Sequence, residues 1–212
     1  MTNYKIKNLF WTVIGVFLLG FGGAMLRLSE LGTDPFTCIN LGISKFSGIS
    51  YGTSTIIFNI ILFIPMTFWY RKGIGIGMLI NMMLLGYISD FCVFMWGKIG
   101  ITTEILSYNF FLQIIFLIIG ILIFCLGVAF YIEANLGIAP YDALGQIIEL
   151  KTKGHIKFSI NRIVTDILCV MIGFFLGSTI GIATIITAFF TGPLVQFYGN
   201  LIKKLFQSPN KK

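Results

Sequence analysis

The stretch Leu31-Gly32-Thr33-Asp34-Pro35-Phe36 returns 105 positions later as Leu136-Gly137-Ile138-Ala139-Pro140-Tyr141. Both copies follow the pattern Leu-Gly-x-x-Pro-aromatic. The register extends beyond the motif, because Ala24 aligns with Ala129 and, after a slip of one residue, Gly86 aligns with Gly192. Self-similarity at a fixed offset is typical of duplication. The sequence therefore predicts two related halves.

Composition indicates a membrane protein. Hydrophobic residues make up 57% of the 212 residues and charged residues only 11%, too few to cover the surface of a soluble domain. Apolar stretches of about 17 or more residues are long enough to cross a bilayer as helices. Six stretches qualify, and they are Leu9–Leu26, Tyr51–Tyr70, Ile74–Trp96, Phe110–Ile132, Phe158–Leu176 and Ile180–Ile202.

Three spans per repeat make the two halves, 1–105 and 106–212, enter the membrane from opposite sides. We therefore expect one all-α integral membrane domain, a polytopic bundle of six transmembrane helices arranged as two inverted three-helix repeats. Inverted repeats recur in secondary transporters, whose substrate sites lie between the repeats and use interrupted helices. Fold analogy alone does not establish transport.

The basic residues predict the orientation. With the start of the first span inside the cell, 12 of the 15 Lys and Arg residues fall on the cytoplasmic side, and the exceptions are Arg27, Lys45 and Lys98. Lys and Arg near spans are retained in the cytoplasm, so both termini are predicted there. The net charge of +7 then reflects this bias and contact with the lipid bilayer, and no nucleic-acid partner is expected.

The motif itself predicts an interrupted helix. Gly32 and Gly137 allow unusual backbone conformations, while Pro35 and Pro140 suit the first turn of a new helix. The segments that follow, 36–46 and 141–150, are too short to span the bilayer. They are either re-entrant helices inside the bundle or amphipathic helices on the membrane surface.

Three polar residues at these helix starts are candidate ligands for a substrate. Asp34 is placed to cap the first short helix. Thr37 and Asp142 align between the repeats and lie in the first turns, where the helix dipole favours an acceptor or an anion.

Asp166 is the leading candidate within a span, because charge in hydrocarbon is costly and marks a cavity, a pathway or a buried pair. Its counterpart in the first repeat is Asn59, and the two are predicted to face one central cavity. The alternative is a structural ion pair between Asp166 and Arg162, one helical turn earlier.

Charges at helix ends give weaker candidates. Arg27 and Glu133 end the first and fourth spans, and we expect either headgroup contacts or an Arg27–Glu133 pair acting as an outer gate. Asp90 on the third span is a candidate of second rank. Gly173 and Gly177 offer a possible contact face for a homodimer.

No metal, cofactor or catalytic centre is expected. The four cysteines, Cys38, Cys92, Cys125 and Cys169, lack the spacing of a metal site, and His155 is the single histidine. An intramembrane enzyme is therefore disfavoured.

Four stretches carry a family resemblance: Arg27-Leu-Ser-Glu-Leu-Gly-Thr-Asp-Pro-Phe-Thr, Gly42-Ile-Ser, Gly48-Ile-Ser-Tyr-Gly and Asn135-Leu-Gly-Ile-Ala-Pro-Tyr-Asp. The chain resembles the YczE/YitT-type bacterial membrane proteins over nearly its whole length. The resemblance implies a multi-pass protein of the bacterial inner membrane, and it supplies neither a substrate nor a catalytic residue.

Two functions remain open from the sequence. The first is a secondary transporter or facilitator of a small polar or anionic solute. The second is a membrane accessory protein that assists a partner protein or an enzyme assembly through its basic loop, 151–157.

Overall fold

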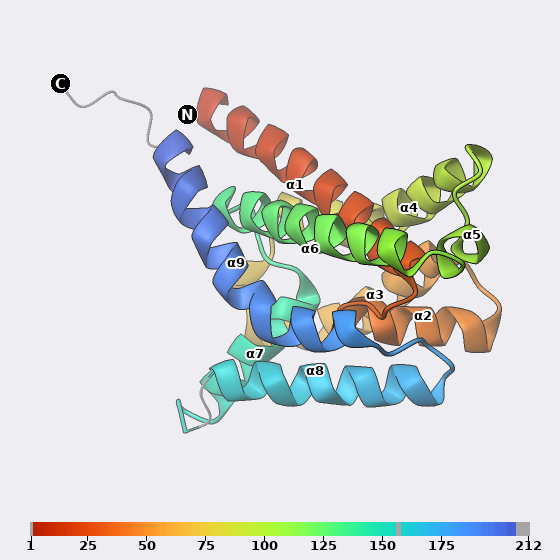
Figure 1. Ribbon diagram of the computed structural model, residues 1–212. Helices are drawn as coiled ribbons and strands as arrows, with labels where there is room; N and C mark the ends of the chain where they lie inside the picture. Colours follow the sequence, from red (N-terminus) through yellow and green to blue (C-terminus); the bar gives the residue numbers. More distant parts are fainter. Residues whose placement is uncertain (1, 156–157, 207–212) are drawn as a thin grey trace.

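The computed structural model describes residues 2–155 and 158–206, and every regular element in these ranges is helical. The helices pack into one bundle (Figure 1). The prediction of an all-helical protein is confirmed. In chain order the elements are α1 (Thr2–Ser29), α2 (Pro35–Ser47), α3 (Tyr51–Trp69), the 3₁₀ turn η1 (Arg71–Gly73), α4 (Ile76–Lys98), α5 (Thr103–Ser107), α6 (Phe110–Glu133), α7 (Pro140–Lys151), α8 (Phe158–Phe175) and α9 (Ile182–Phe206).

Helices α1, α3, α4, α6 and α9 are long and apolar enough to cross a bilayer, and each overlaps one predicted span. The remaining predicted span, 158–176, coincides with α8, which has 18 residues. Large apolar side chains cover the outside of the bundle. For example, Phe175 is 80% exposed and Phe189 is 72% exposed. Hydrocarbon accommodates such a surface and water does not, so the chain is a multi-pass membrane protein.

The motif interrupts the chain as the sequence predicts. Gly32 and Gly137 have φ values of +98° and +111°, a region that side chains rarely adopt. Pro35 and Pro140 then open α2 and α7. Asp34 caps α2 by accepting a hydrogen bond from the Thr37 N–H at 3.1 Å.

The two short helices lie inside the bundle. In Figure 1, α2 and α7 begin near its middle and run toward opposite sides. Pro35, Thr37 and Cys38 of α2 are buried, as are Pro140 and Tyr141 of α7. The structure thus favours the re-entrant alternative over helices that lie on the membrane surface.

Helix α2 packs tightly on α8. A Cβ atom on Gly42 would lie 2.7 Å from the carbonyl oxygen of Gly173, and one on Gly173 would lie 2.7 Å from that of Cys38. The expectation that Gly173 forms part of a dimer face is therefore wrong. The small size of Gly173 allows the contact between α2 and α8. A Cβ atom on Gly177, in contrast, would meet no atom within 4 Å.

Helices α1 and α6 cross at the centre of the bundle in opposite directions. Near the start of α1, the Asn8 side chain donates a hydrogen bond to the Ala134 carbonyl just after the end of α6 (2.9 Å). Glycines make the close approach: a Cβ on Gly15 would lie 2.9 Å from the Gly127 carbonyl oxygen, and one on Gly22 would lie 2.9 Å from that of Gly120. Small residues at such crossings let two backbones touch.

Each motif loop is bonded to the first turn of a long helix in the other half. Leu31 accepts a hydrogen bond from the Ala183 N–H of α9, and Leu136 accepts one from the Gly77 N–H of α4, both at 2.8 Å. These bonds satisfy backbone groups that the interrupted helices leave free. The two halves are therefore interlocked through their equivalent loops.

The halves differ where the third helix of each packs. Gly86 of α4 lies against α3, since a Cβ there would stand 2.7 Å from the Cα of Gly52. Its counterpart Gly192 of α9 has no atom within 4 Å of the same position. Helix α9 also contains Pro193 and is visibly bent in Figure 1, as proline commonly causes. Helix α9 thus packs less closely at Gly192 than α4 does at Gly86.

Replacing Gly127 with alanine should destabilise the protein by about 1–3 kcal/mol, because the added methyl group meets backbone of α1 that has no room to move. Its Cβ would lie 2.6 Å from the Leu19 nitrogen. Gly97→Ala is the matched control, since its Cβ meets nothing within 4 Å. Denaturant unfolding in detergent measures both, and equal stability of the two variants would contradict the assigned crossing.

Candidate functional site

A cavity of about 430 Å³ lies where the two short helices begin. Its walls come from α1, α2, α3, α4, α6, α7, α8 and α9, so residues far apart in the sequence meet there. The polar and aromatic residues of the lining are Asp34, Phe36, Thr37, Tyr51, Asn81, Ser89, Phe124, Tyr131, Tyr141, Asp142, Gln146, Arg162, Asp166, Thr187 and Thr191. A cavity of this size fits a small molecule.

Asp34 is the most deeply buried acid of the cavity, at 7% exposure. One carboxylate oxygen caps α2, whereas Oδ2 has no hydrogen-bond partner within the described residues. Thr37, in the same helical turn, is hydrogen-bonded to the Tyr51 hydroxyl at 3.2 Å. Buried polar groups are normally paired, so this unpaired oxygen is an unusual feature of a residue that lines the cavity.

The second half contributes a charged cluster. Arg162 of α8 forms ion pairs with Asp142 of α7 and with Asp166, where Nε lies 3.3 Å from Oδ1. The Tyr141 hydroxyl donates a hydrogen bond of 2.5 Å to Asp166, and the Arg162 guanidinium lies over the Tyr141 ring at 4.7 Å. These contacts hold the start of α7 against α8.

The structure therefore contains the Asp166–Arg162 pair that the sequence left as an alternative, and Asp166 also lines the cavity. Asn59 does not lie among the lining residues. It is 1% exposed and follows Thr55 by one turn on α3. The predicted sharing of one cavity by Asn59 and Asp166 is wrong, because Asn59 is buried outside the lining of the cavity.

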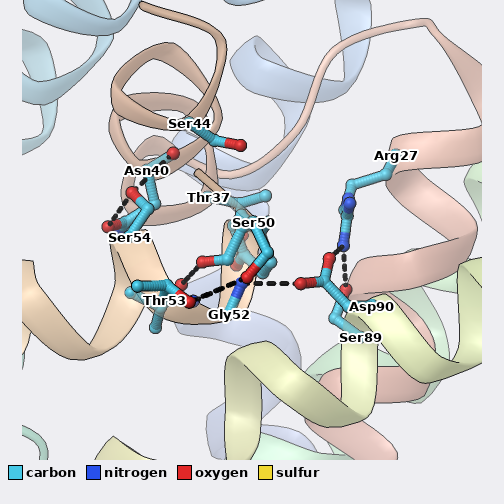
Figure 2. Close-up of polar contacts among 12 residues, drawn as sticks. Arg27, Thr37, Asn40, Ser44, Ser50, Gly52, Thr53, Ser54, Ser89 and Asp90 are labelled. Carbon is cyan, nitrogen blue, oxygen red and sulfur yellow. Dashed lines mark hydrogen bonds and ion pairs between the residues drawn. The ribbon is translucent and has the colours of Figure 1, made fainter. Parts of the chain in front are cut away.

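Arg27 belongs to a polar clamp that ties α1, α3 and α4 together (Figure 2). Its guanidinium donates hydrogen bonds of 2.9 Å to Ser89 and to Asp90. The other oxygen of Asp90 accepts from the Gly52 N–H at 2.7 Å. Arg27 also lies over the Tyr51 ring at 4.4 Å. We call Arg27, Tyr51, Gly52, Ser89 and Asp90 the clamp.

The clamp stands between two cavities. Ser89 and Tyr51 line the central cavity, whereas Arg27 lines a smaller one of about 190 Å³ together with Glu30 and Lys45. The hydrogen bond between Arg27 and Ser89 thus joins a lining residue of each cavity. Asp90, a candidate of second rank from sequence, is thus the residue that anchors the clamp.

The predicted pair of Arg27 with Glu133 is wrong. Glu133 lies 3.4 Å from the Lys203 amino group, near the end of α9. Because α1 and α6 run in opposite directions, the end of one helix and the end of the other lie on opposite sides of the bundle.

Sequence reasoning missed the aromatic part of the site. Tyr131 lines the cavity, is 3% exposed, and its hydroxyl has no hydrogen-bond partner within the described residues. The sequence motif identifies Tyr141 only as its aromatic position and gives it no role in binding. No sequence signal separates Tyr131 from the many other aromatic residues of the spans.

Groups of metal-ligand type do not gather in the part of the chain that the structure describes. The four cysteines, Cys38, Cys92, Cys125 and Cys169, are buried and unpaired as disulfides. His155 lies on the exposed loop after α7.

A family model described as a family of unknown function, DUF6198, matches residues 6–200. The chain belongs to this family. It is similar to an uncharacterized protein of Haemophilus influenzae, with 29% identity over 98% of the chain and 90% of the relative. It is also similar to the uncharacterized membrane protein YczE of Bacillus subtilis, with 29% identity over 88% of the chain and 84% of the relative. The uncharacterized protein YyaS of the same organism is 28% identical over 94% of the chain and 96% of the relative. No solved structure matches.

In this DUF6198 protein, Asp90→Ala should lower the free energy of unfolding by about 2–3 kcal/mol, because it removes the charge partner of Arg27 and the acceptor of the Gly52 N–H. The side chains of the Arg27–Asp90 pair are 15% and 25% exposed. Lys203→Ala, which breaks a pair whose lysine is 57% exposed, should cost less than about 1 kcal/mol. Denaturant titrations in detergent compare the two variants. An equal loss of unfolding free energy in both would contradict the stabilising role of the clamp.

Proposed function

We propose that this protein is a secondary transporter or facilitator that moves a small polar solute across the bacterial cell membrane. One observation carries the proposal: the central cavity lies where two short helices, entering from opposite sides of the bundle, both begin. Secondary transporters place their substrate sites at such interruptions, because free backbone groups and helix ends are available there.

Reciprocal contacts support an inverted repeat. The Leu31–Ala183 and Leu136–Gly77 hydrogen bonds join equivalent positions with the halves exchanged. The Gly15–Gly127 and Gly22–Gly120 contacts do the same at the crossing of α1 and α6. A two-fold axis in the membrane plane relates such pairs to each other. We accordingly infer six spans, α1, α3, α4, α6, α8 and α9, with three in each half.

We further infer that the start of α1 and the end of α9 face the cytoplasm. Both lie on the same side of the bundle in Figure 1, together with the end of α7 and the start of α8. Of the 12 Lys and Arg residues that the sequence assigns to the cytoplasm, Arg162 lies in α8 beside the cavity, and the other 11 agree with this orientation. Labelling of a His155→Cys variant by a membrane-impermeant maleimide outside intact cells would contradict it.

In this proposal the clamp closes the outer side. Arg27 and Asp90 join the end of α1 to α4, and Gly52 joins α3 to the same carboxylate. Solute release to the outside then requires the first-half helices to separate at the clamp while the Tyr141–Asp142–Arg162–Asp166 cluster moves with α7 and α8. Rocking of one half against the other is the movement expected of an inverted-repeat transporter.

Filling the cavity should stop transport without unfolding the protein. Gly192 lines the cavity and a Cβ there meets no atom within 4 Å, so Gly192→Phe places a ring in open space. Gly97→Phe is the matched control, because its Cβ also meets nothing and Gly97 does not line the cavity.

Purified protein in liposomes loaded with a pool of small metabolites provides the assay, with released compounds identified by mass spectrometry. At least one compound should leave wild-type and Gly97→Phe liposomes about tenfold faster or more than Gly192→Phe liposomes. Release of no compound above protein-free liposomes would favour the accessory-protein alternative, in which neither glycine affects solute movement.

A further inference from the structure

We propose that the solute is a small organic monocation, an amine whose charged group binds Asp34. This inference rests on the proposed function, since it names the substrate class of the same cavity. It also revises the anionic solute that the helix starts alone suggest.

The charge balance of the cavity carries the first step. Three carboxylates line it, those of Asp34, Asp142 and Asp166, while Arg162 is the one lysine or arginine in its described lining. The starts of α2 and α7 add roughly half a positive charge each. With all three carboxylates ionised, about one negative charge stays uncompensated. An added anion would increase that imbalance, and a monocation removes it.

The contacts locate this charge at Asp34. Arg162 is already shared between Asp142 and Asp166, and Asp166 also accepts from the Tyr141 hydroxyl. Asp34 has no ion pair in the described structure, and its Oδ2 is buried without a hydrogen-bond partner. Burial disfavours the ionised form of such a carboxyl group, and a cation that donates to its free oxygen stabilises that form.

The walls fit an amine with an apolar body. Aromatic rings of Phe36, Tyr51, Phe124, Tyr131 and Tyr141 line the same cavity. Ring faces attract a cation and pack against an apolar skeleton. The Tyr131 hydroxyl, which also has no partner in the described structure, offers a second acceptor for an ammonium group.

Size separates an organic cation from a bare metal ion. A cavity of about 430 Å³ holds the volume of roughly fourteen water molecules, which corresponds to about a dozen non-hydrogen atoms. Three residues of metal-ligand type do not cluster anywhere in the described ranges. A single metal ion would therefore leave most of the cavity empty.

Binding measurements on the purified full chain in detergent test the inference. The probes are the primary amines of three skeletons, hexyl, cyclohexylmethyl and 2-phenylethyl, each beside the alcohol and the carboxylate built on the same skeleton. At least one amine should bind about tenfold or more tightly than its alcohol and carboxylate, because a charged hydrogen bond contributes about 1.5–3 kcal/mol.

Asp34→Asn should weaken that amine about tenfold or more and leave the alcohol unchanged. Asparagine keeps the oxygen that caps α2, so the variant is expected to fold. Glu104→Gln removes one negative charge from exposed α5 and should bind like the wild type. The inference is overturned if a carboxylate binds best, if none of the three amines binds, or if Asp34→Asn binds the amine as tightly as the wild type.

The liposome assay separates this inference from the proposed function. Cavity-dependent release of only neutral or anionic compounds would leave the transporter standing and overturn the cationic solute. Amine binding that depends on Asp34, without release of any compound, would support the amine site and overturn the proposed transport.

Discussion

Hydrogen bonding of the backbone inside hydrocarbon is the constraint on which the rest of this structure depends. A helix broken in the bilayer leaves N–H and C=O groups that water cannot reach, and each must find a partner within the protein. Here the two Leu-Gly-x-x-Pro loops find theirs in each other's halves, through Leu31 with Ala183 and Leu136 with Gly77. The close crossing of α1 and α6 brings the halves near enough for this exchange.

The broken helices also create the cavity. Because α2 and α7 start near the middle of the bundle, their first turns bring Asp34, Thr37, Tyr141 and Asp142 to one place. The halves are not equivalent there. The first half closes through Gly52 and Gly86 and is held by the clamp, whereas Gly192 in the second half faces open space. In the proposed transporter, this unequal closure corresponds to one state of an alternating cycle.

Much of this architecture follows from the sequence, and the partners of individual charges do not. The length of the apolar stretches and the proline positions predict the long and short helices, and the motif predicts where the chain is interrupted. The pairing of Arg27 with Asp90 and of Glu133 with Lys203 depends on helix rotation and on which ends of antiparallel helices meet. Tyr131 gave no signal, because one aromatic residue among many in a span looks like packing until its hydroxyl is found buried and free.

Accessibility of the cavity from each side of the membrane tests the central claim most directly. A single cysteine at Gly192, in a chain whose four native cysteines are replaced by alanine, places a thiol in the cavity without a clash. Its reaction with a membrane-impermeant thiol reagent is measured in vesicles of either orientation. The account predicts modification from both sides, with the outer-side rate rising in an Asp90→Ala background because the clamp is broken. Modification from one side alone, whatever the state of the clamp, would contradict transport through this cavity.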